Sequence, residues 1–463
     1  MKNYCALLML VSLCLAGCSK SFNLLGKQCP CITGYECDPA TNTCVPEGTL
    51  DASFDAPDDS DEPEPDPLAA TAVSLGSDHA CALFEDSKIV CWGKSSDGQL
   101  GYGRSTNVGD DEVPKKVGFV SVGGNVVHLV TGNFHSCAVL EDGTVRCWGL
   151  NSFGQLGNGD TDTIGDDTGE HPASLLPVDV GGTVVQIAAG YTHTCALFDT
   201  GSMRCWGGNH FGQLGYGHDN STDNGTLPSE LPAVSVGGNV KQIAAGYGHT
   251  CALLNSGNMR CWGLNSNGKL GYGHTDNIGD DELPSEVSVV DVGEEVSSIA
   301  ANGNHTCALL STGDVRCWGD NGNGQLGNGD REPIGDDELP SSVPPLNFEG
   351  KVTQIAAGYR HTCALLENGT VRCWGANESG ELGYGHTMPV GDELHSLPGD
   401  QPVLSLGGTV KHLASGFGHT CAVLDTGTVR CWGENDDGEL GYGDMKTIGD
   451  NELPSSAGPA SLR

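Results

Sequence analysis

The stretch HTCALLENGTVRCWGANESGELGYG, residues His361–Gly385, is the clearest copy of a unit that the chain repeats seven times. Each copy has two cysteines ten residues apart, and a tryptophan follows the second. The first cysteines recur 56 or 58 residues apart, at Cys81, Cys137, Cys195, Cys251, Cys307, Cys363 and Cys421. Repetition at a fixed period of this length indicates one ring-like β architecture with seven equivalent positions.

Each copy is a series of short predicted strands separated by turn residues. In the second copy the strands are VVHLVTG, which starts at Val126, HSCAVL (His135–Leu140) and TVRCWG (Thr144–Gly149). A strand bounded by proline, such as LPVDV (Leu176–Val180), would be the fourth. Seven units of four short strands predict an all-β fold, a seven-bladed β-propeller of four-stranded blades.

The paired cysteines of each copy are predicted to face each other across a hairpin. Cys137 and Cys147 are symmetric about Asp142, and Gly143 suits the left-handed position of a three-residue loop. The first copy has Ser87 there, so its turn is open to a different form. The alternatives are disulfides or reduced, buried thiols. An exported context, argued next, favours the disulfides: Cys81–Cys91, Cys137–Cys147, Cys195–Cys205, Cys251–Cys261, Cys307–Cys317, Cys363–Cys373 and Cys421–Cys431.

The N-terminus is typical of a targeting signal. Residues 1–18 contain a charged Lys2 and an apolar run, Ala6–Leu15, that is too short to span a bilayer. The end of this run, LAGC, resembles a bacterial lipobox, in which the cysteine carries lipid and becomes the mature N-terminus. The resemblance implies lipid attachment at Cys18, and Ser19 after it favours the outer membrane, facing the periplasm or the cell exterior. An ordinary cleaved secretory signal is the alternative.

Two segments separate this signal from the repeats. Residues 19–49 contain Cys29, Cys31, Cys37 and Cys44, which predict a small segment held by two disulfides of undetermined pairing, with a zinc site as the alternative. Residues 50–68 include DASFDAPDDSDEPEPDP, with eight acidic residues and four prolines. This composition favours an extended spacer. The propeller is then expected to fill residues 69–463.

The repeated unit resembles that of the regulator of chromosome condensation family, whose members are seven-bladed propellers. The resemblance implies a ring closed by strands from both chain ends. LPSSAGPASLR (Leu453–Arg463) looks like the strand that is missing from the first copy, Ala72–Leu83. The chain departs from the family in its cysteines. The founding member is a nuclear exchange factor on chromatin, and that function is not transferred to an exported, acidic protein.

The formal net charge of −38 restricts the partners. Nucleic acids and anionic membrane surfaces require lysine and arginine, so neither is expected as a partner. Acidic loops such as IGDDELP (278–284) recur at one repeat position and should emerge on one face. They predict binding of calcium or of a basic protein, with solvated turns as the alternative. The candidate residues are Asp110, Asp111, Asp166, Asp167, Asp280, Asp281, Asp336, Asp337, Asp392, Glu393 and Asp450.

No sequence pattern indicates catalysis. The chain has no G-x-S-x-G or H-E-x-x-H motif. Gly263–Lys269 fits GxxxxGK, but Leu270 replaces the Ser or Thr that a phosphate loop requires. A histidine stands two residues before the first cysteine of every copy and is expected to be a structural hydrogen-bonder. We therefore expect no enzyme activity and no cofactor, with Ca²⁺ as the one candidate ion.

Together these features predict a lipid-anchored, exported propeller that acts as a monomeric protein-binding module. One alternative is a propeller that binds cations or polysaccharide, or an enzyme acting on polysaccharide. Another is a structural protein of the envelope. The sequence does not identify the partner.

Overall fold

The computed structural model describes residues 35–38, 43–46, 68–223 and 225–463. The chain forms two compact units, Met1–Pro67 and Leu68–Arg463. In the first unit β1 (Tyr35–Asp38) pairs antiparallel with β2 (Thr43–Pro46). The predicted signal peptide with Cys18, as well as Cys29 and Cys31, lies outside the described residues.

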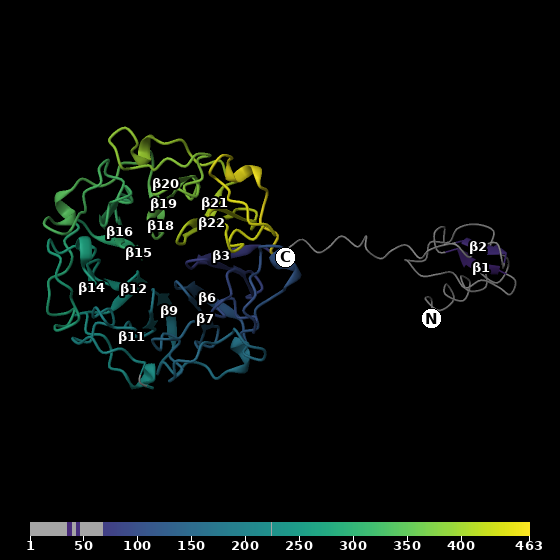
Figure 1. Cartoon of the computed structure of the whole chain (residues 1–463), viewed down its shortest axis with the longest axis horizontal. Coiled ribbons are helices and arrows are strands. Elements are labelled where there is room, and N and C mark those ends of the chain that lie inside the picture. Colours follow the sequence, from purple (N-terminus) through teal and green to yellow (C-terminus); the bar gives the residue numbers. More distant parts are fainter. Residues whose placement is uncertain (1–34, 39–42, 47–67, 224) are drawn as a thin grey trace, which may run out of the picture. The chain divides into compact units, whose positions relative to one another are not determined.

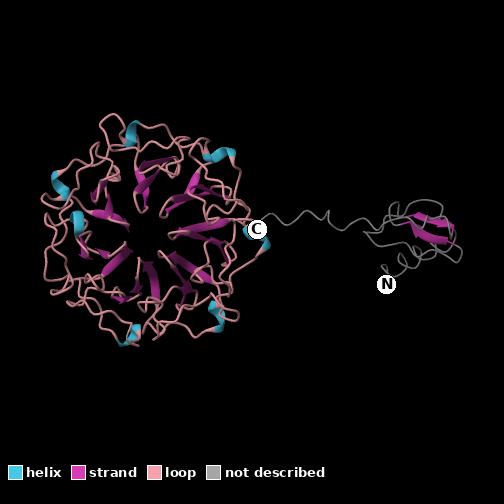
Figure 2. Ribbon diagram, in the orientation of Figure 1, coloured by secondary structure: helices cyan, strands magenta, loops and turns pink. Residues whose placement is uncertain are grey.

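The second unit is a seven-bladed β-propeller, as predicted, in which seven three-stranded antiparallel sheets surround a central axis (Figure 1, Figure 2). The first strand of each sheet lies nearest the axis: β3 (Ala70–Leu75), β6 (Val126–Thr131), β9 (Val184–Ala189), β12 (Val240–Ala245), β15 (Val296–Asn302), β18 (Val352–Ala357) and β21 (Val410–Ser415). The middle strands are β4 (His79–Phe84), β7 (His135–Leu140), β10 (His193–Phe198), β13 (His249–Leu254), β16 (His305–Leu310), β19 (His361–Leu366) and β22 (His419–Leu424). The third strands are β5 (Ile89–Gly93), β8 (Val145–Gly149), β11 (Met203–Gly207), β14 (Met259–Gly263), β17 (Val315–Gly319), β20 (Val371–Gly375) and β23 (Val429–Gly433).

The helices of the propeller are short 3-10 turns near its outer rim (Figure 2). They are η2 (Pro114–Lys116), η3 (Pro172–Ser174), η4 (Pro228–Glu230), η5 (Ser266–Gly268), η6 (Pro340–Ser342), η7 (Pro398–Asp400) and η8 (Pro454–Ser456). All except η5 begin at a proline, whose fixed φ suits the first helical position. Among the described residues, no helix has the length and hydropathy needed to cross a bilayer.

The middle strand of each blade is buried along its whole length, because it lies between two strands and two neighbouring blades. In the first blade Cys81 stands directly opposite Cys91 in register, and a disulfide joins them. The other six copies have the same bond, so the disulfides match the prediction. Each closes a short loop, so it constrains hairpin register more than chain entropy.

The hairpin turn of the first copy has the same form as the others. Gly143 has a φ of 82°, and its counterpart Ser87 has a φ of 62°. Ser87 therefore adopts the left-handed conformation that the other copies assign to glycine, at a cost of about 1 kcal/mol. The register of the hairpin, rather than the residue type, determines this turn.

The predicted fourth strand of each blade is not confirmed as a strand. A segment does run beside the third strand, but one backbone hydrogen bond joins the two, such as Val178 N to Val145 O at 2.9 Å. The equivalent donors in the other blades are Val120, Val234, Val290, Leu346, Leu404 and Ala460. In five of the seven segments a proline stands one or two residues before the donor. Because proline cannot donate, the blade ends in an irregular edge instead of a ladder.

The predicted exchange of strands between the chain ends is not confirmed either. The C-terminal segment Leu453–Arg463 lies in the last blade, where Ala460 N donates to Val429 O of β23 at 2.9 Å. The first blade has its own outer segment, in which Val120 N donates to Ile89 O at 3.0 Å. The ring therefore closes by contact between two blades that are each built from consecutive residues.

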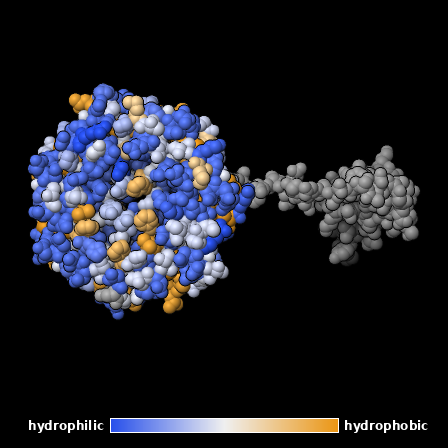
Figure 3. Space-filling model, viewed as in Figure 1, coloured by the Kyte–Doolittle hydropathy of each residue, from blue (hydrophilic) through white to orange (hydrophobic). Residues whose placement is uncertain are grey.

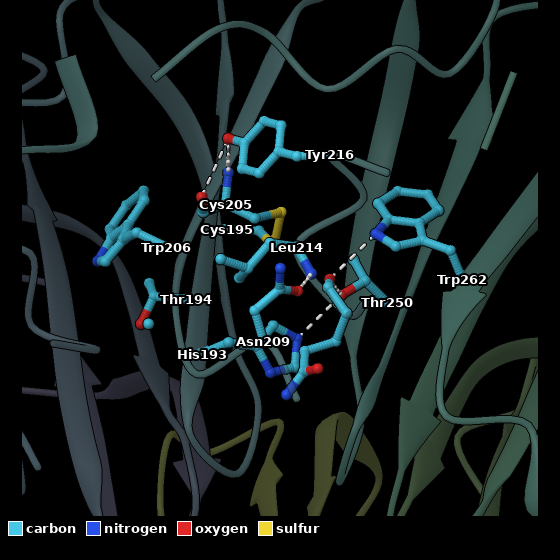
Figure 4. Close-up of a disulfide and its surroundings, with 12 residues drawn as sticks. His193, Thr194, Cys195, Cys205, Trp206, Asn209, Leu214, Tyr216, Thr250 and Trp262 are labelled. Atoms are coloured by element: carbon cyan, nitrogen blue, oxygen red, sulfur yellow. Dashed lines mark hydrogen bonds between the residues drawn. A yellow bond between two sulfur atoms is a disulfide. The ribbon is translucent and has the colours of Figure 1, made fainter. Parts of the chain in front are cut away.

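Neighbouring blades are joined by a buried chain of hydrogen bonds that recurs at six junctions. Between the third and fourth blades His193 Nε2 lies 2.9 Å from Thr250 Oγ1, and that hydroxyl donates to Gln213 O at 2.8 Å (Figure 4). Because the hydroxyl proton points at the carbonyl, the Nε2 proton of histidine is donated to the hydroxyl. Trp262 Nε1 donates to the same carbonyl at 3.0 Å.

The junction between the last and first blades lacks the hydroxyl. Residue 80 is alanine, where the other copies have serine or threonine. Both ring nitrogens of His419 consequently have no hydrogen-bond partner within the described residues. Trp92 Nε1 still donates to Glu439 O, at 2.8 Å. This closing junction therefore differs in chemistry from the other six.

Candidate functional site

The ring has two faces, which are formed by different turns and loops. The loop face is formed by the turns between first and second strands and by the long loops after the third strands. The hairpin face is formed by the turns between second and third strands, at the opposite ends of the middle strands. All the predicted acidic residues lie in the long loops of the loop face. In the view of Figure 3 the ring surface is mostly hydrophilic, with small separate hydrophobic spots.

The acidic loops do not converge on a common site. In three of them the carboxylate oxygens of three consecutive residues lie within 4.8 Å of one another, forming the acidic triads Asp110–Asp111–Glu112, Asp280–Asp281–Glu282 and Asp336–Asp337–Glu338. Within the described part of the chain, Asp166, Asp167 and Asp450 belong to no such group. The structure therefore brings the predicted residues together only within their own blades.

The glutamate of each triad was not among the predicted residues, although it completes a visible DDE pattern. Burial, and then the neighbouring Asp111, raises the pKa of Glu112 to about 7. Burial and Asp281 raise the pKa of Glu282 to about 7 in the same way. These carboxyl groups are thus close to half-ionised at neutral pH, and a bound cation would favour their charged form.

Another acidic loop is engaged in ion pairs. Asp392 pairs with Arg331 of the preceding blade at 2.7 Å. Glu393 lies 2.8 Å from His395 Nε2, a pair that carries opposite charges only when the imidazole is protonated. These predicted site residues therefore have partners within the ring.

The acidic loops also take part in the junctions between blades. Gly279, which precedes the Asp280 pair, accepts a hydrogen bond at its carbonyl from Gly217 N of the previous blade at 3.1 Å. Its φ is 95°, and a Cβ there would lie 2.5 Å from Gly212 O. Only glycine fits this position. Ring packing therefore fixes where these loops emerge, independently of any ligand.

The recurring histidines are buried in the junctions and form no exposed site. Burial lowers the pKa of His79 and His135 to about 3, and that of His193 and His305 to about 4. They are neutral at physiological pH, and all except His419 serve as hydrogen-bond donors between blades. Their structural role agrees with the expectation from the sequence.

One buried position at the junctions changes its charge among the copies. Four copies have glutamine there, at Gln99, Gln155, Gln213 and Gln325, whereas the others have Lys269, Glu381 and Glu439. Burial raises the pKa of Glu439 to about 8 and lowers the pKa of Lys269 to about 8. The Nζ of Lys269 is hydrogen-bonded to Asn304 Oδ1 at 2.6 Å, so this buried lysine does not project toward a phosphate site.

An aromatic cluster at the mouth of the central channel was not predicted. We define the mouth cluster as Tyr191, Tyr247, Tyr359 and Phe417, each of which follows the glycine of a turn between first and second strands. Its ring centroids are 4.4 Å apart for Tyr191 and Tyr247, 6.3 Å for Tyr247 and Tyr359, and 4.1 Å for Tyr359 and Phe417. The walls of a cavity of about 260 Å³ inside the ring include Tyr359 and Phe417. The only signal of this cluster in the sequence is the residue that follows the glycine in the turn G-x-x-H, which varies among the copies.

The blades and their repeated junctions define a class, the seven-bladed β-propellers built from sequence repeats. The profile of the RCC1-like domain matches residues 165–460, and profiles of the regulator of chromosome condensation (RCC1) repeat match residues 70–99, 126–155 and 87–139. The chain belongs to this RCC1-like family.

The ultraviolet-B receptor UVR8 of Arabidopsis thaliana is 31% identical over 389 residues, which are 83% of this chain and 81% of the receptor. The human E3 ubiquitin-protein ligase HERC2 is 29% identical over 332 residues, which are 71% of this chain but 6% of the ligase. Among solved structures, yeast RCC1 (Prp20) bound to Kap60 has a TM-score of 0.63 and 23% identity, covering 84% of this chain and 85% of that one. At that identity the last match shows the fold alone.

Proposed function

We propose that the chain is an exported propeller, anchored to the bacterial outer membrane by lipid on Cys18, that binds a protein partner through its loop face without catalysing a reaction. The observation that supports the proposal is that residues common to the copies and residues that vary among them occupy different parts of the ring. The cysteines, tryptophans and histidines common to the copies are buried inside the ring. The mouth cluster and the acidic parts of the long loops, which vary among the copies, lie on the loop face.

A rigid scaffold with variable loops on one side suits recognition. The disulfide in every blade fixes the middle strand against the third strand, and these are the strands from which the loop face emerges. One relative supports a binding role, since UVR8 is named a receptor. The net charge of −38 favours a basic partner.

Site-specific photo-crosslinking in cells tests which face is used. A benzophenone side chain would replace Leu394, exposed in a long loop of the loop face, or Glu367, exposed in a turn of the hairpin face. We expect one discrete protein adduct from position 394 and none from position 367. Adducts of equal yield from both positions, or from position 367 alone, would contradict the proposal.

Metabolic labelling with a palmitate analogue tests the anchor. We expect the full-length chain to incorporate label and to fractionate with the outer membrane. The Cys18→Ser variant should lose both properties. A mature protein that is unlabelled and leaves the membrane fraction would instead support the alternative of an ordinary secretory signal.

The three acidic triads favour calcium binding as a second candidate function, because hard carboxylate oxygens in close groups are the ligands that Ca²⁺ prefers. Raised pKa values at Glu112 and Glu282 mean that protons compete with the ion. Isothermal titration should therefore show tighter Ca²⁺ binding at pH 8 than at pH 6. Asp281→Asn should remove one site, whereas Asp167→Asn, outside any triad, should not. Absence of heat at pH 8 would reject this function.

A further inference from the structure

We propose that the mouth of the central channel on the loop face binds an arginine-bearing segment of a basic protein, with Tyr359, Phe417 and Glu434 as the main contacts. This inference rests on the proposed protein-binding function. It specifies where on the ring the partner binds and which type of side chain is recognised. It joins two features of the loop face, the mouth cluster and a group of carboxylates beside it.

The mouth cluster offers aromatic surface that is partly exposed. Phe417 is 40% exposed, and its ring stacks on Tyr359 with an interplanar angle of 19°. The contacts with Tyr247 and Tyr191 extend this surface along the rim of the channel. Electron-rich ring faces attract a planar guanidinium, and arginine stacks on them better than lysine does.

A carboxylate stands beside this aromatic surface. Gly418 follows Phe417 in the chain, and a Cβ at Gly418 would collide with Glu434 Oε2. Burial, and then the charges of Asp78, Asp436 and Asp437, raise the pKa of Glu434. The raised pKa therefore reflects the burial of this carboxyl group first and the three neighbouring aspartates second.

The lysine near Glu434 already forms ion pairs with two other carboxylates. Lys94 pairs with Asp78 at 3.3 Å and with Asp437 at 3.2 Å. Glu434 has no ion-pair partner in the part of the chain that the structure describes. A guanidinium on the Phe417 ring would therefore reach an uncompensated carboxylate, which makes the site complementary to a basic segment in both shape and charge.

The opposite side of the mouth shows that the carboxylate is a specific feature. Gly248 is the counterpart of Gly418 in the fourth blade. There, the side chains nearest to its Cβ position are Phe211, at 3.3 Å, and Leu264, at 3.4 Å. The mouth thus differs between two blades, since it is apolar beside Gly248 and has a carboxylate beside Gly418.

The fold already places one guanidinium on the cluster. Arg360 is exposed, and its Cζ lies 5.5 Å from the centroid of the Tyr359 ring. The geometry of an arginine over this surface is therefore available. Arg360 competes for the ring and repels a cationic ligand, so its removal should strengthen binding. A second copy of this chain is disfavoured as the occupant, since two chains of net charge −38 repel each other.

Fluorescence anisotropy with the full-length chain and a labelled nona-arginine peptide tests the inference. We expect Phe417→Ala to weaken binding about tenfold, although it leaves the net charge unchanged. Glu434→Gln should weaken binding and reduce its salt dependence, and Arg360→Ala should strengthen it. Glu367→Gln, which removes one charge on the hairpin face, is the matched control and should have little effect. Nona-lysine should bind more weakly than nona-arginine.

Four results would overturn the inference. Equal affinity of Phe417→Ala and the parent would mean that diffuse charge attracts the peptide, and failure of the parent to bind would exclude the site. Self-association that sedimentation detects in the parent but not in Phe417→Ala would identify a second copy as the occupant. Retention of the position-394 crosslink in a Phe417→Ala background would keep the protein-binding function but reject this location. Thermal unfolding of each variant establishes that it is folded.

Discussion

Between the third and fourth blades Thr250 connects His193 to the Gln213 carbonyl, whereas between the last and first blades Ala80 stands in the same place and His419 has no partner. The six interior junctions thus use a buried, uncharged chain of hydrogen bonds. Such bonds are protected from water and are costly to leave unmade. The closing junction has lost one of them.

The closing junction has ionic contacts of its own, although an ion pair between Arg331 and Asp392 also crosses one interior junction. Lys94 pairs with Asp437 across it, and Arg463, near the end of the chain, pairs with Asp86 at 2.6 Å. The Arg463 guanidinium also lies 4.1 Å from the Phe84 ring centroid. Partly exposed ion pairs contribute about 0–1 kcal/mol each. We therefore expect this closing junction, where the first and last blades meet, to be the weakest and to separate first on unfolding.

The largest loss of stability is expected from substitution of the buried tryptophan, which both kinds of junction contain. Trp262 at an interior junction and Trp92 at the closing junction are both fully buried and both donate to a carbonyl. Substitution of either by alanine should lower the free energy of unfolding by about 3–5 kcal/mol. Urea denaturation followed by circular dichroism measures this loss. Unequal losses at the two junctions would show that the tryptophans, too, act differently at the closing junction.

Removal of an interior hydroxyl should make that junction resemble the closing one. Thr250→Ala leaves His193 Nε2 without its acceptor, and the expected loss is about 1–3 kcal/mol. Thr250→Ser is the matched control, because Ser136 makes the same contacts at another junction. An unchanged urea midpoint for Thr250→Ala would mean that the hydrogen-bonded chain does not stabilise the ring.

The parts of the fold that depend on local spacing were predictable. A ten-residue separation across a glycine turn placed Cys137 opposite Cys147, and the period determined the number of blades. The outer strand and the closure were not, because they depend on single contacts such as that of Ala460 with Val429. A resemblance to the family cannot specify which blade the last residues join.

The candidate site was predictable only as a set of loops. The sequence shows Asp280 and Asp281 at a repeated position, but whether loops from different blades meet depends on their distance from the ring axis. The mouth cluster has the opposite character, since Tyr359 and Phe417 lie 58 residues apart in sequence and stack only because neighbouring blades converge at the axis. The only signal of the mouth cluster in the sequence was the variable residue after the glycine in the turn between the first and second strands.

The buried carboxyl group of Glu439 makes the stability of the closing junction depend on pH. Glu439 occupies the position of Gln213, and burial raises its pKa to about 8. The folded state therefore favours the protonated form, so this residue destabilises the ring above pH 8 and ceases to do so as the pH falls toward 4.5. Glu439→Gln keeps the acceptor for Asp437 N and should stabilise by about 1–2 kcal/mol at pH 8, with no gain near pH 4.5.

The control for this contrast is the reverse change at an interior junction, Gln213→Glu, which should destabilise at pH 8 and not near pH 4.5. The lowered pKa values of the buried histidines make all variants less stable in acid, but this contribution cancels when each variant is compared with the parent at the same pH. A gain from Glu439→Gln that is equal at both pH values would contradict a buried, titrating carboxyl group.

The smallest expected effect is the repair of the closing junction. Ala80→Ser restores a hydroxyl between His419 Nε2 and the Glu439 carbonyl, and Ser136 shows that serine fits this position at an interior junction. The free energy of unfolding should rise by about 0.5–1.5 kcal/mol. Ala82→Ser is the control, because Ala82 is also fully buried in β4 but is alanine in every copy and has no such pair to bridge. That variant should be destabilised, and a similar loss from Ala80→Ser would show that the closing junction is packed differently from the other six.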